Sequence, residues 1–192
     1  MTEYPLPPPW RQNDFRYAAL EGYFSGQECD AIVELAMRLP ATEGQISAAL
    51  SLDPKRRQSL LRWIEWTTES NWIYGKLAQL FQNVNRLMFQ FDLTSLPSLQ
   101  FTEYRAPAGH YTWHQDSGGG PDFSRRKLSA VVQLSDPAEY EGGRLELFEA
   151  PELPVSKGTA IVFPSYEHHR VSMTSRGIRR SLVCWCSGPP TR

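Results

Sequence analysis

The chain has 192 residues, of which 41% are hydrophobic and 21% charged, and its formal net charge at pH 7 is −1. This near-neutral balance argues against a nucleic-acid-binding protein, which carries a strongly basic surface. No run approaches the roughly 18 apolar residues of a membrane-spanning helix. The apolar fraction suits a buried core, so we expect residues 1–192 to form a single domain.

The predicted compartment follows from the N-terminus and the cysteines. Residues 1–5 lack the basic start and the apolar run of a signal peptide. The three cysteines, Cys29, Cys184 and Cys186, are odd in number and have no CxxC spacing. They indicate neither a disulfide framework nor a zinc site. We therefore expect a cytoplasmic protein that does not bind membranes.

The N-terminal part begins with a proline-rich arm. Residues 1–10 contain the run Pro-Leu-Pro-Pro-Pro, which favours an extended arm over the surface, with a ligand for a partner domain as the alternative. Residues 11–97 are expected to be mainly helical. Ser25 and Glu28 have capping-box spacing at the start of a helical pattern that stops at Pro40.

A second helix is expected over residues 69–89. Its apolar residues recur at the three-and-four spacing of one helical face, and such a stripe packs most simply on a sheet. Between the two helices, residues 60–64 fit a strand or a short helix equally well.

Residues 98–188 have the composition of a β-core. Short segments rich in Val, Leu, Phe, Tyr and Trp alternate with Gly, Pro, Asp and Ser. Seven or eight strands without intervening helices predict an antiparallel barrel or a double-sheet jelly roll. The expected class is α+β, with a jelly-roll core (a double-stranded β-helix) and the N-terminal helices packed on one sheet. The strands are expected at residues 98–105, 110–116, 127–134, 143–149, 159–163, 168–173 and 178–187.

A metal site is predicted from two histidines and one acid. His114 and Asp116 are two residues apart, so in a strand both side chains project from the same face. His169 follows 55 residues later, on a strand that a jelly roll can bring alongside. Two His and one carboxylate on one face of an ion form the facial triad of non-haem Fe(II) oxygenases. The alternative for His168 and His169 is one surface residue and one hydrogen-bonded core residue.

A carboxylate-binding group is predicted ten residues further on. In a strand, Arg179 and Ser181 share a face and Arg180 points the other way. A guanidinium beside a hydroxyl suits a carboxylate. An inward, unpaired arginine is costly, so Arg179 requires an acidic partner from the protein or from a ligand. An exposed basic strand edge is the alternative.

This order of motifs resembles the 2-oxoglutarate and Fe(II)-dependent dioxygenase superfamily, specifically its prolyl-4-hydroxylase-like branch. The resemblance covers residues 98–188, and the segments that carry it are residues 104–116, 128–136, 140–145, 163–171 and 176–179. It implies a hydroxylase that couples oxidative decarboxylation of 2-oxoglutarate by O2, giving succinate and CO2, to hydroxylation of a substrate.

The resemblance also implies roles for individual residues. Fe(II) ligands would be His114, Asp116 and His169, and the distal carboxylate of 2-oxoglutarate would be held by Arg179 and Ser181. Two further residues would bind the cosubstrate, namely Tyr104, which lines the pocket, and Gln133, which stands near Arg179 where some relatives have Tyr. The substrate is expected to be a peptidyl proline, with a free amino acid or small metabolite as the alternative.

Several features leave alternatives open. Residues 117–126 fit a substrate lid or a flexible hairpin loop. Trp113 and Trp185 are expected to point away from the metal, into packing under the helices, as are Cys184 and Cys186. Other function classes are a non-catalytic jelly-roll module and a cupin-type isomerase, although the latter usually has a denser His cluster. Exposed edges of a small β-core allow a homodimer.

Overall fold

Within residues 16–44, 53–118 and 124–189, which the computed structural model describes, the chain forms two antiparallel sheets. The larger sheet has the strand order β1-β10-β7-β12-β5-β4-β2, with β8 paired to β12, and the smaller has the order β3-β6-β11-β9. The proline-rich arm and residues 119–123 of the expected lid loop lie outside the described residues. The strands are β1 (Ala18–Leu20), β2 (Thr42–Glu43), β3 (Arg57–Gln58), β4 (Leu60–Ile64), β5 (Leu99–Arg105), β6 (His110–His114), β7 (Arg126–Gln133), β8 (Tyr140–Gly142), β9 (Leu145–Leu147), β10 (Ala160–Pro164), β11 (His169–Val171) and β12 (Thr174–Ser187).

Both predicted helices are present. α1 (Gly26–Met37) starts with a capping box, in which Ser25 Oγ accepts from the Glu28 N–H and the Glu28 carboxylate accepts from the Ser25 N–H. α2 (Asn71–Val84) continues as a π-helical turn (Asn85–Phe89), which ends at the left-handed residue Gln90.

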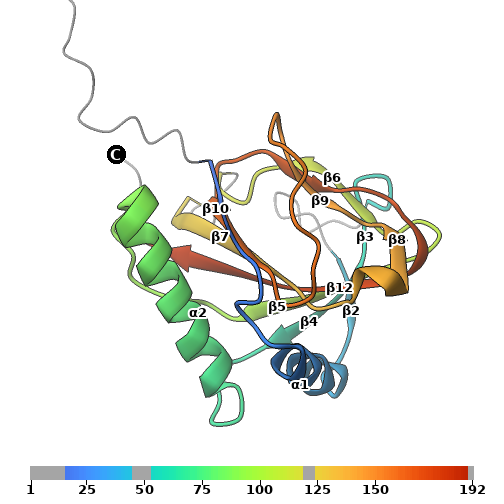
Figure 1. Cartoon of the computed structure of the whole chain (residues 1–192), viewed down its shortest axis with the longest axis horizontal. Helices are drawn as coiled ribbons and strands as arrows, with labels where there is room; N and C mark the ends of the chain where they lie inside the picture. The colour runs from blue at the N-terminus through green and yellow to red at the C-terminus, as the bar shows by residue number, and fades with distance from the viewer. Residues whose placement is uncertain (1–15, 45–52, 119–123, 190–192) are drawn as a thin grey trace, which may run out of the picture.

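The helices cover one face of the larger sheet, and the smaller sheet lies on the other side (Figure 1). Strand alternation assigns the two faces. Under the helices, fully buried Phe101, Val132 and Leu182 pack with Leu77 and Phe81 of α2. Burial of these apolar side chains supplies the main driving force for the packing.

A second apolar cluster fills the space between the two sheets. It includes Tyr104, Val131 and Ile161 from the larger sheet and Tyr111 and Val171 from the smaller one. Alternate residues of the larger sheet therefore pack into two different cores, one under the helices and one between the sheets. This is the arrangement of a jelly roll and confirms the predicted fold class.

The N-terminal part contributes strands as well as helices. Residues 60–64, ambiguous in the sequence, form β4, which pairs with β5, and β1 pairs with β10. β2 and β3 are two residues each and join the larger and the smaller sheet, respectively. No helix in the described segments has the length and apolarity to cross a membrane.

Candidate metal centre and cosubstrate pocket

The smaller sheet brings the predicted triad together. β6 ends at His114, and β11 begins at His169, directly opposite His114 in the antiparallel pairing. Asp116 follows two residues after His114, and its backbone N–H donates to the carbonyl of Ser165. Two segments 55 residues apart therefore meet because adjacent antiparallel strands align these positions.

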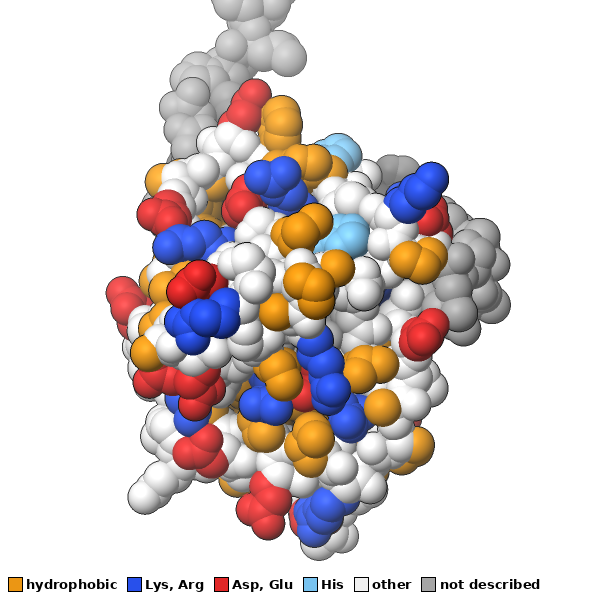
Figure 2. Space-filling model, turned by 90° about the vertical axis from the view of Figure 1, so that its right-hand side faces the viewer, with side chains coloured by type: hydrophobic (Ala, Val, Ile, Leu, Met, Phe, Trp, Pro, Cys, Tyr) orange, Lys and Arg blue, Asp and Glu red, His pale blue; other side chains and the backbone are white. Residues whose placement is uncertain are grey.

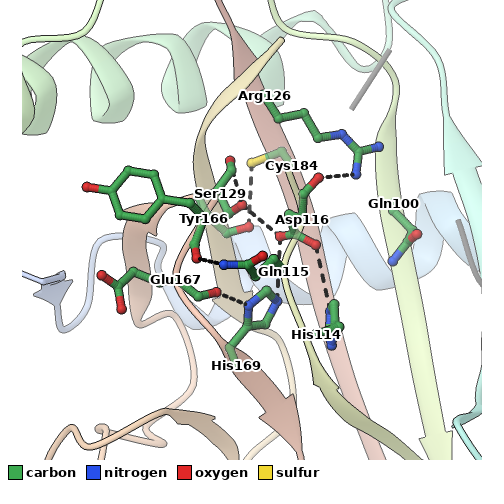
Figure 3. Close-up of polar contacts among 12 residues, drawn as sticks. Gln100, His114, Gln115, Asp116, Arg126, Ser129, Tyr166, Glu167, His169 and Cys184 are labelled. Carbon is green, nitrogen blue, oxygen red and sulfur yellow. Dashed lines mark hydrogen bonds and ion pairs between the residues drawn. The ribbon is translucent and has the colours of Figure 1, made fainter. Parts of the chain in front are cut away.

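The three side chains surround one point. Asp116 lies between the two imidazoles, with Oδ1 at 3.7 Å from His114 Nε2 and Oδ2 at 3.5 Å from His169 Nε2 (Figure 3). One ligand atom from each residue lies within 4.8 Å of the other two. Protein ligands bind first-row metals at about 2.0–2.2 Å, which separates right-angled ligands by about 3 Å. The donor set and its spacing therefore fit a single divalent ion.

Hydrogen bonds direct both imidazoles toward that point. His114 Nδ1 donates to the Thr112 carbonyl at 2.8 Å, and His169 Nδ1 donates to the Glu167 carbonyl at 3.0 Å. A carbonyl accepts only, so Nδ1 carries the proton and Nε2 keeps its lone pair for a metal. His168, by contrast, is exposed and does not belong to this group of three side chains.

Charge and burial favour the protonation states that bind metals. Burial lowers the pKa of His114, and the neighbouring His169 lowers it further. Burial alone would raise the pKa of Asp116, but the two imidazoles and a 2.7 Å hydrogen bond from Ser129 Oγ outweigh it and lower this pKa. A neutral imidazole and an ionised carboxylate are the forms that coordinate a cation.

Arg179 is a buried cation with spare hydrogen-bonding capacity. It is 1% exposed, and its Nε and Nη2 atoms donate to Gln133 Oε1 at 3.2 and 2.8 Å. Nη1 is buried without a hydrogen-bond partner in the described part of the chain, and burial lowers the pKa of the guanidinium. Such a group is stabilised by an incoming carboxylate. The donors present thus fit a carboxylate ligand.

One cavity of about 370 Å³ joins the metal triad to Arg179. Ser181 and Tyr104 line it together with the triad, whereas Gln133 lies behind Arg179 and does not line it. The face of the molecule at the right of Figure 1 carries His side chains among hydrophobic ones, with charges of both signs around them (Figure 2).

The expectation for Trp185 was wrong, and strand alternation explains why. Arg179, Ser181 and Trp185 are odd-numbered residues of β12 and all line the cavity, whereas Cys184 and Cys186 belong to the core under the helices. Trp113 lies neither in the cavity nor under the helices. It is 38% exposed and packs beside Phe148 on the outside of the smaller sheet, so it points away from the metal triad as expected but not into the packing under the helices.

Other residues near the triad were not predicted. Ser129 Oγ bonds Asp116 and lies 3.0 Å from Ser165 Oγ. The guanidinium carbon of Arg126, the first residue of β7, lies 3.7 Å from the centre of the Trp185 ring, and Arg126 donates to the Asp116 carbonyl at 3.4 Å. A serine within a strand forms no distinctive sequence pattern, so only the tertiary contact with Asp116 reveals the role of Ser129.

A jelly roll that holds two His and one carboxylate beside a basic cavity defines a class, the non-haem Fe(II) oxygenase domains. Residues 99–187 match the model of the 2OG-Fe(II) oxygenase superfamily. This part of the chain, which includes the triad, Arg179 and Ser181, is therefore similar to that superfamily.

Its curated relatives include PKHD-type hydroxylases. One from Crocosphaera subtropica is 38% identical over 94 residues, which is 46% of this chain and 41% of the relative. One from Sphingopyxis alaskensis is 35% identical over 112 residues, which is 54% of this chain and 49% of the relative. The chain thus matches half or less of the length of these relatives.

Solved structures share the fold over most of the chain. A Pseudomonas putida prolyl-4-hydroxylase has a TM-score of 0.70 at 21% identity, covering 91% of this chain and 93% of that one. A Trichoplax adhaerens prolyl hydroxylase, in complex with a hypoxia inducible factor peptide fragment, has a TM-score of 0.75 at 16% identity, covering 91% and 84%.

Proposed function

We propose that this chain is a 2-oxoglutarate- and O2-dependent hydroxylase with a mononuclear Fe(II) centre. The observation that carries the proposal is the convergence of His114, Asp116 and His169 beside a buried guanidinium with an unpartnered Nη1 atom. Fe(II), 2-oxoglutarate and O2 supply the oxidising chemistry, which yields succinate, CO2 and a hydroxylated substrate. A non-catalytic jelly-roll module would not require a complete triad facing a buried cation.

The chain's own residues bind and orient the reactants. His114, Asp116 and His169 hold the metal through two Nε2 atoms and a carboxylate oxygen. Arg179 and Ser181 hold the distal carboxylate of 2-oxoglutarate through Nη1 and the hydroxyl group. The walls of the buried pocket restrict water, which strengthens these charged contacts.

Two further residues act at the cosubstrate end. Tyr104 is 3% exposed, and its ring centre lies 5.6 Å from the Arg179 guanidinium carbon, so it forms a wall beside the bound carboxylate. Gln133 acts through Arg179, because it occupies two donor atoms of the guanidinium and directs the third toward the ligand.

For the substrate we propose a prolyl residue in a peptide, which binds at the mouth of the cavity beside Arg126 and Trp185. The support comes from relatives described as prolyl hydroxylases, one of them solved with a peptide. The cavity mouth also has a wide aromatic wall, since the Trp63 ring lies 6.4 Å from that of Trp185 and is 41% exposed.

The test is succinate production from 2-oxoglutarate, measured under O2 with Fe(II), alone and with proline-containing peptides or free L-proline. Stimulation by peptides supports the proposed substrate, and stimulation only by the free amino acid rejects it.

In the same assay, Asp116→Ala should abolish turnover. Arg179→Met should raise KM for 2-oxoglutarate about 10- to 100-fold, the range for a lost charged hydrogen bond. Arg176→Met, at an exposed position of the same strand, is the control. Wild-type activity in Asp116→Ala would reject the proposed centre.

A further inference from the structure

Arg57 is a buried arginine for which the reaction proposed above has no use. It lies in β3, paired with Tyr111 of β6, and is 8% exposed. It lines the same cavity as the metal triad and Arg179. A buried charged side chain is costly unless its surroundings compensate it, so the contacts of Arg57 next to the candidate centre define what it can do there.

Arg57 is connected to the metal triad through one aromatic ring. Its guanidinium carbon lies 4.6 Å from the centre of the Tyr111 ring, within the range of a cation–π contact. The Tyr111 ring in turn stacks on the His114 imidazole, with centroids 3.5 Å apart and an angle of 18° between planes. The three side chains are therefore in contact in series, and the last is a proposed metal ligand.

The guanidinium is itself fixed from behind. Arg57 Nε donates to Ser59 Oγ at 2.9 Å, and the Gly44 N–H donates to the Ser59 carbonyl. The backbone at Gly44 packs so closely that a Cβ there would lie 2.7 Å from Arg57 Nε and 2.3 Å from Ser59 Oγ. Only glycine leaves this space, so Arg57 has little freedom to move away from Tyr111.

The stack supplies a constraint that hydrogen bonding does not. The bond from His114 Nδ1 to the Thr112 carbonyl fixes one direction in the imidazole plane. This bond alone does not prevent the ring from tilting about that direction. A second ring lying flat on the imidazole removes this tilt and therefore fixes the direction of Nε2.

We propose that Arg57 is a positioning residue for the metal centre, which holds the Tyr111 ring against His114 so that His114 Nε2 stays directed at the ion. This inference rests on the proposed function in one respect, since it requires the triad to bind a divalent metal. Groups that orient a ligand from behind typically change metal affinity 10- to 100-fold when they are removed.

The test is anaerobic Co(II) titration of the full chain, followed by the visible absorption of the bound ion. Arg57→Met keeps the length of the stem and removes the charge and the planar group, and it should weaken Co(II) binding at least about 10-fold. Arg57→Lys should also bind more weakly than wild type, because an ammonium lacks the planar face. Tyr111→Phe keeps the ring and should bind as wild type. Arg56→Met, at the exposed neighbouring position, is the matched control.

The outcomes separate this inference from the proposed function. Co(II) affinity and absorption unchanged in Arg57→Met would overturn the positioning role while leaving the metal centre intact. No Co(II) binding by the wild type would reject the metal centre itself, and the inference with it. If Arg57→Met does not fold, Gly44→Ala takes its place, because the added methyl would collide with both Ser59 Oγ and Arg57 Nε and so displace the arginine from outside the cavity. A loss of affinity in that variant supports the role, and wild-type affinity overturns it.

Discussion

The carboxylate of Asp116 is oriented by a hydroxyl group that comes from a different sheet. Ser129 lies in β7 of the larger sheet, is fully buried, and donates to Asp116 Oδ2 at 2.7 Å. This bond keeps one carboxylate oxygen occupied and the plane of the carboxylate fixed, and it contributes to the lowered pKa of Asp116. Ser129 therefore acts on the metal site without being a ligand.

We expect Ser129→Ala to weaken divalent-metal binding about 10-fold, the lower end of the range for groups that orient a ligand. The measurement is a Mn(II) titration in which free Mn(II) is followed by electron paramagnetic resonance. Ser175→Ala, at an exposed position of β12, should bind as wild type. Equal affinities in the two variants would mean that Asp116 needs no such support.

Gln133 provides a second prediction at the level of one residue. Gln133→Leu has nearly the same size but accepts no hydrogen bonds, so Arg179 Nε and Nη2 lose their partner and the guanidinium can turn. We expect KM for 2-oxoglutarate to rise about 10-fold while kcat changes little, since a lost charged hydrogen bond is worth about 1.5–3 kcal/mol. Steady-state succinate assays measure both constants, with Gln79→Leu on the exposed side of α2 as control. A fall in kcat alone would contradict this role.

At the level of strands, a charge cluster connects β4, β5 and β12 on the face opposite to the cavity. Glu103 of β5 is fully buried and accepts from Arg62 at 2.7 Å, from Arg105 at 3.1 Å and from Arg180 at 3.1 Å. Burial raises the pKa of Glu103, but the three guanidinium groups outweigh it and hold this pKa below its ordinary value. The cluster therefore fixes three neighbouring strands around one carboxylate.

This cluster predicts a pH-dependent stability. A carboxyl group with a lowered native pKa stabilises the fold above its unfolded pKa, and this contribution is lost as the pH falls through the native pKa. At pH 7, Glu103→Gln should be about 3–5 kcal/mol less stable than wild type, the usual cost of removing one partner from a buried ion pair. Urea unfolding between pH 7 and pH 3 should show this difference narrowing as the pH falls. A difference independent of pH would show that packing, rather than charge, holds Glu103.

The strands also show how far sequence reasoning reaches. Of the core strands from β5 to β12, all but β8 were predicted, because alternation and strand-forming residues persist over several positions. β8 has only three residues. β2 and β3 were not predicted either, because two residues carry no periodic pattern and pair only through tertiary contact. The second helix was expected to run to residue 89, but regular α-helix ends at Val84 and a π-helical turn follows, which the same apolar spacing does not distinguish.

The residues of the candidate site also differ in whether a local sequence pattern could predict them. His114, Asp116 and His169 could be predicted because rare residue types at a fixed spacing point to metal chemistry. Arg57 and Ser129 could not, because an arginine that follows Lys55 and Arg56 and a serine inside a strand have ordinary surface and core explanations. Their roles depend on which strands become neighbours, and a single sequence does not encode that in local pattern.

For the whole molecule, the site joins both sheets, so its ligands should stabilise the entire fold. The metal ligands come from or follow strands of the smaller sheet, and Arg179 and Ser181 come from the larger one. A ligand that binds only the native state at 100 times its Kd adds about 2.7 kcal/mol to the free energy of unfolding.

We therefore expect Mn(II) with 2-oxoglutarate to raise Tm in scanning calorimetry by several degrees, and excess chelator to reverse the rise. Each ligand alone should give a smaller shift. The Asp116→Ala variant should fold, but Mn(II) should not raise its Tm. An equal rise in Asp116→Ala would place the bound ion elsewhere on the molecule.

β12 carries both the reactive pocket and the apolar core on a single backbone. Its odd-numbered residues Arg179, Ser181 and Trp185 face the cavity, and its even-numbered residues Leu182 and Cys184 face the helices. Losing or gaining one amino acid inside this strand would exchange the two faces, moving the guanidinium into hydrocarbon and the thiol into the pocket. We therefore expect inherited variation in this strand to proceed by replacement of side chains, and changes of length to be restricted to the connections at its two ends.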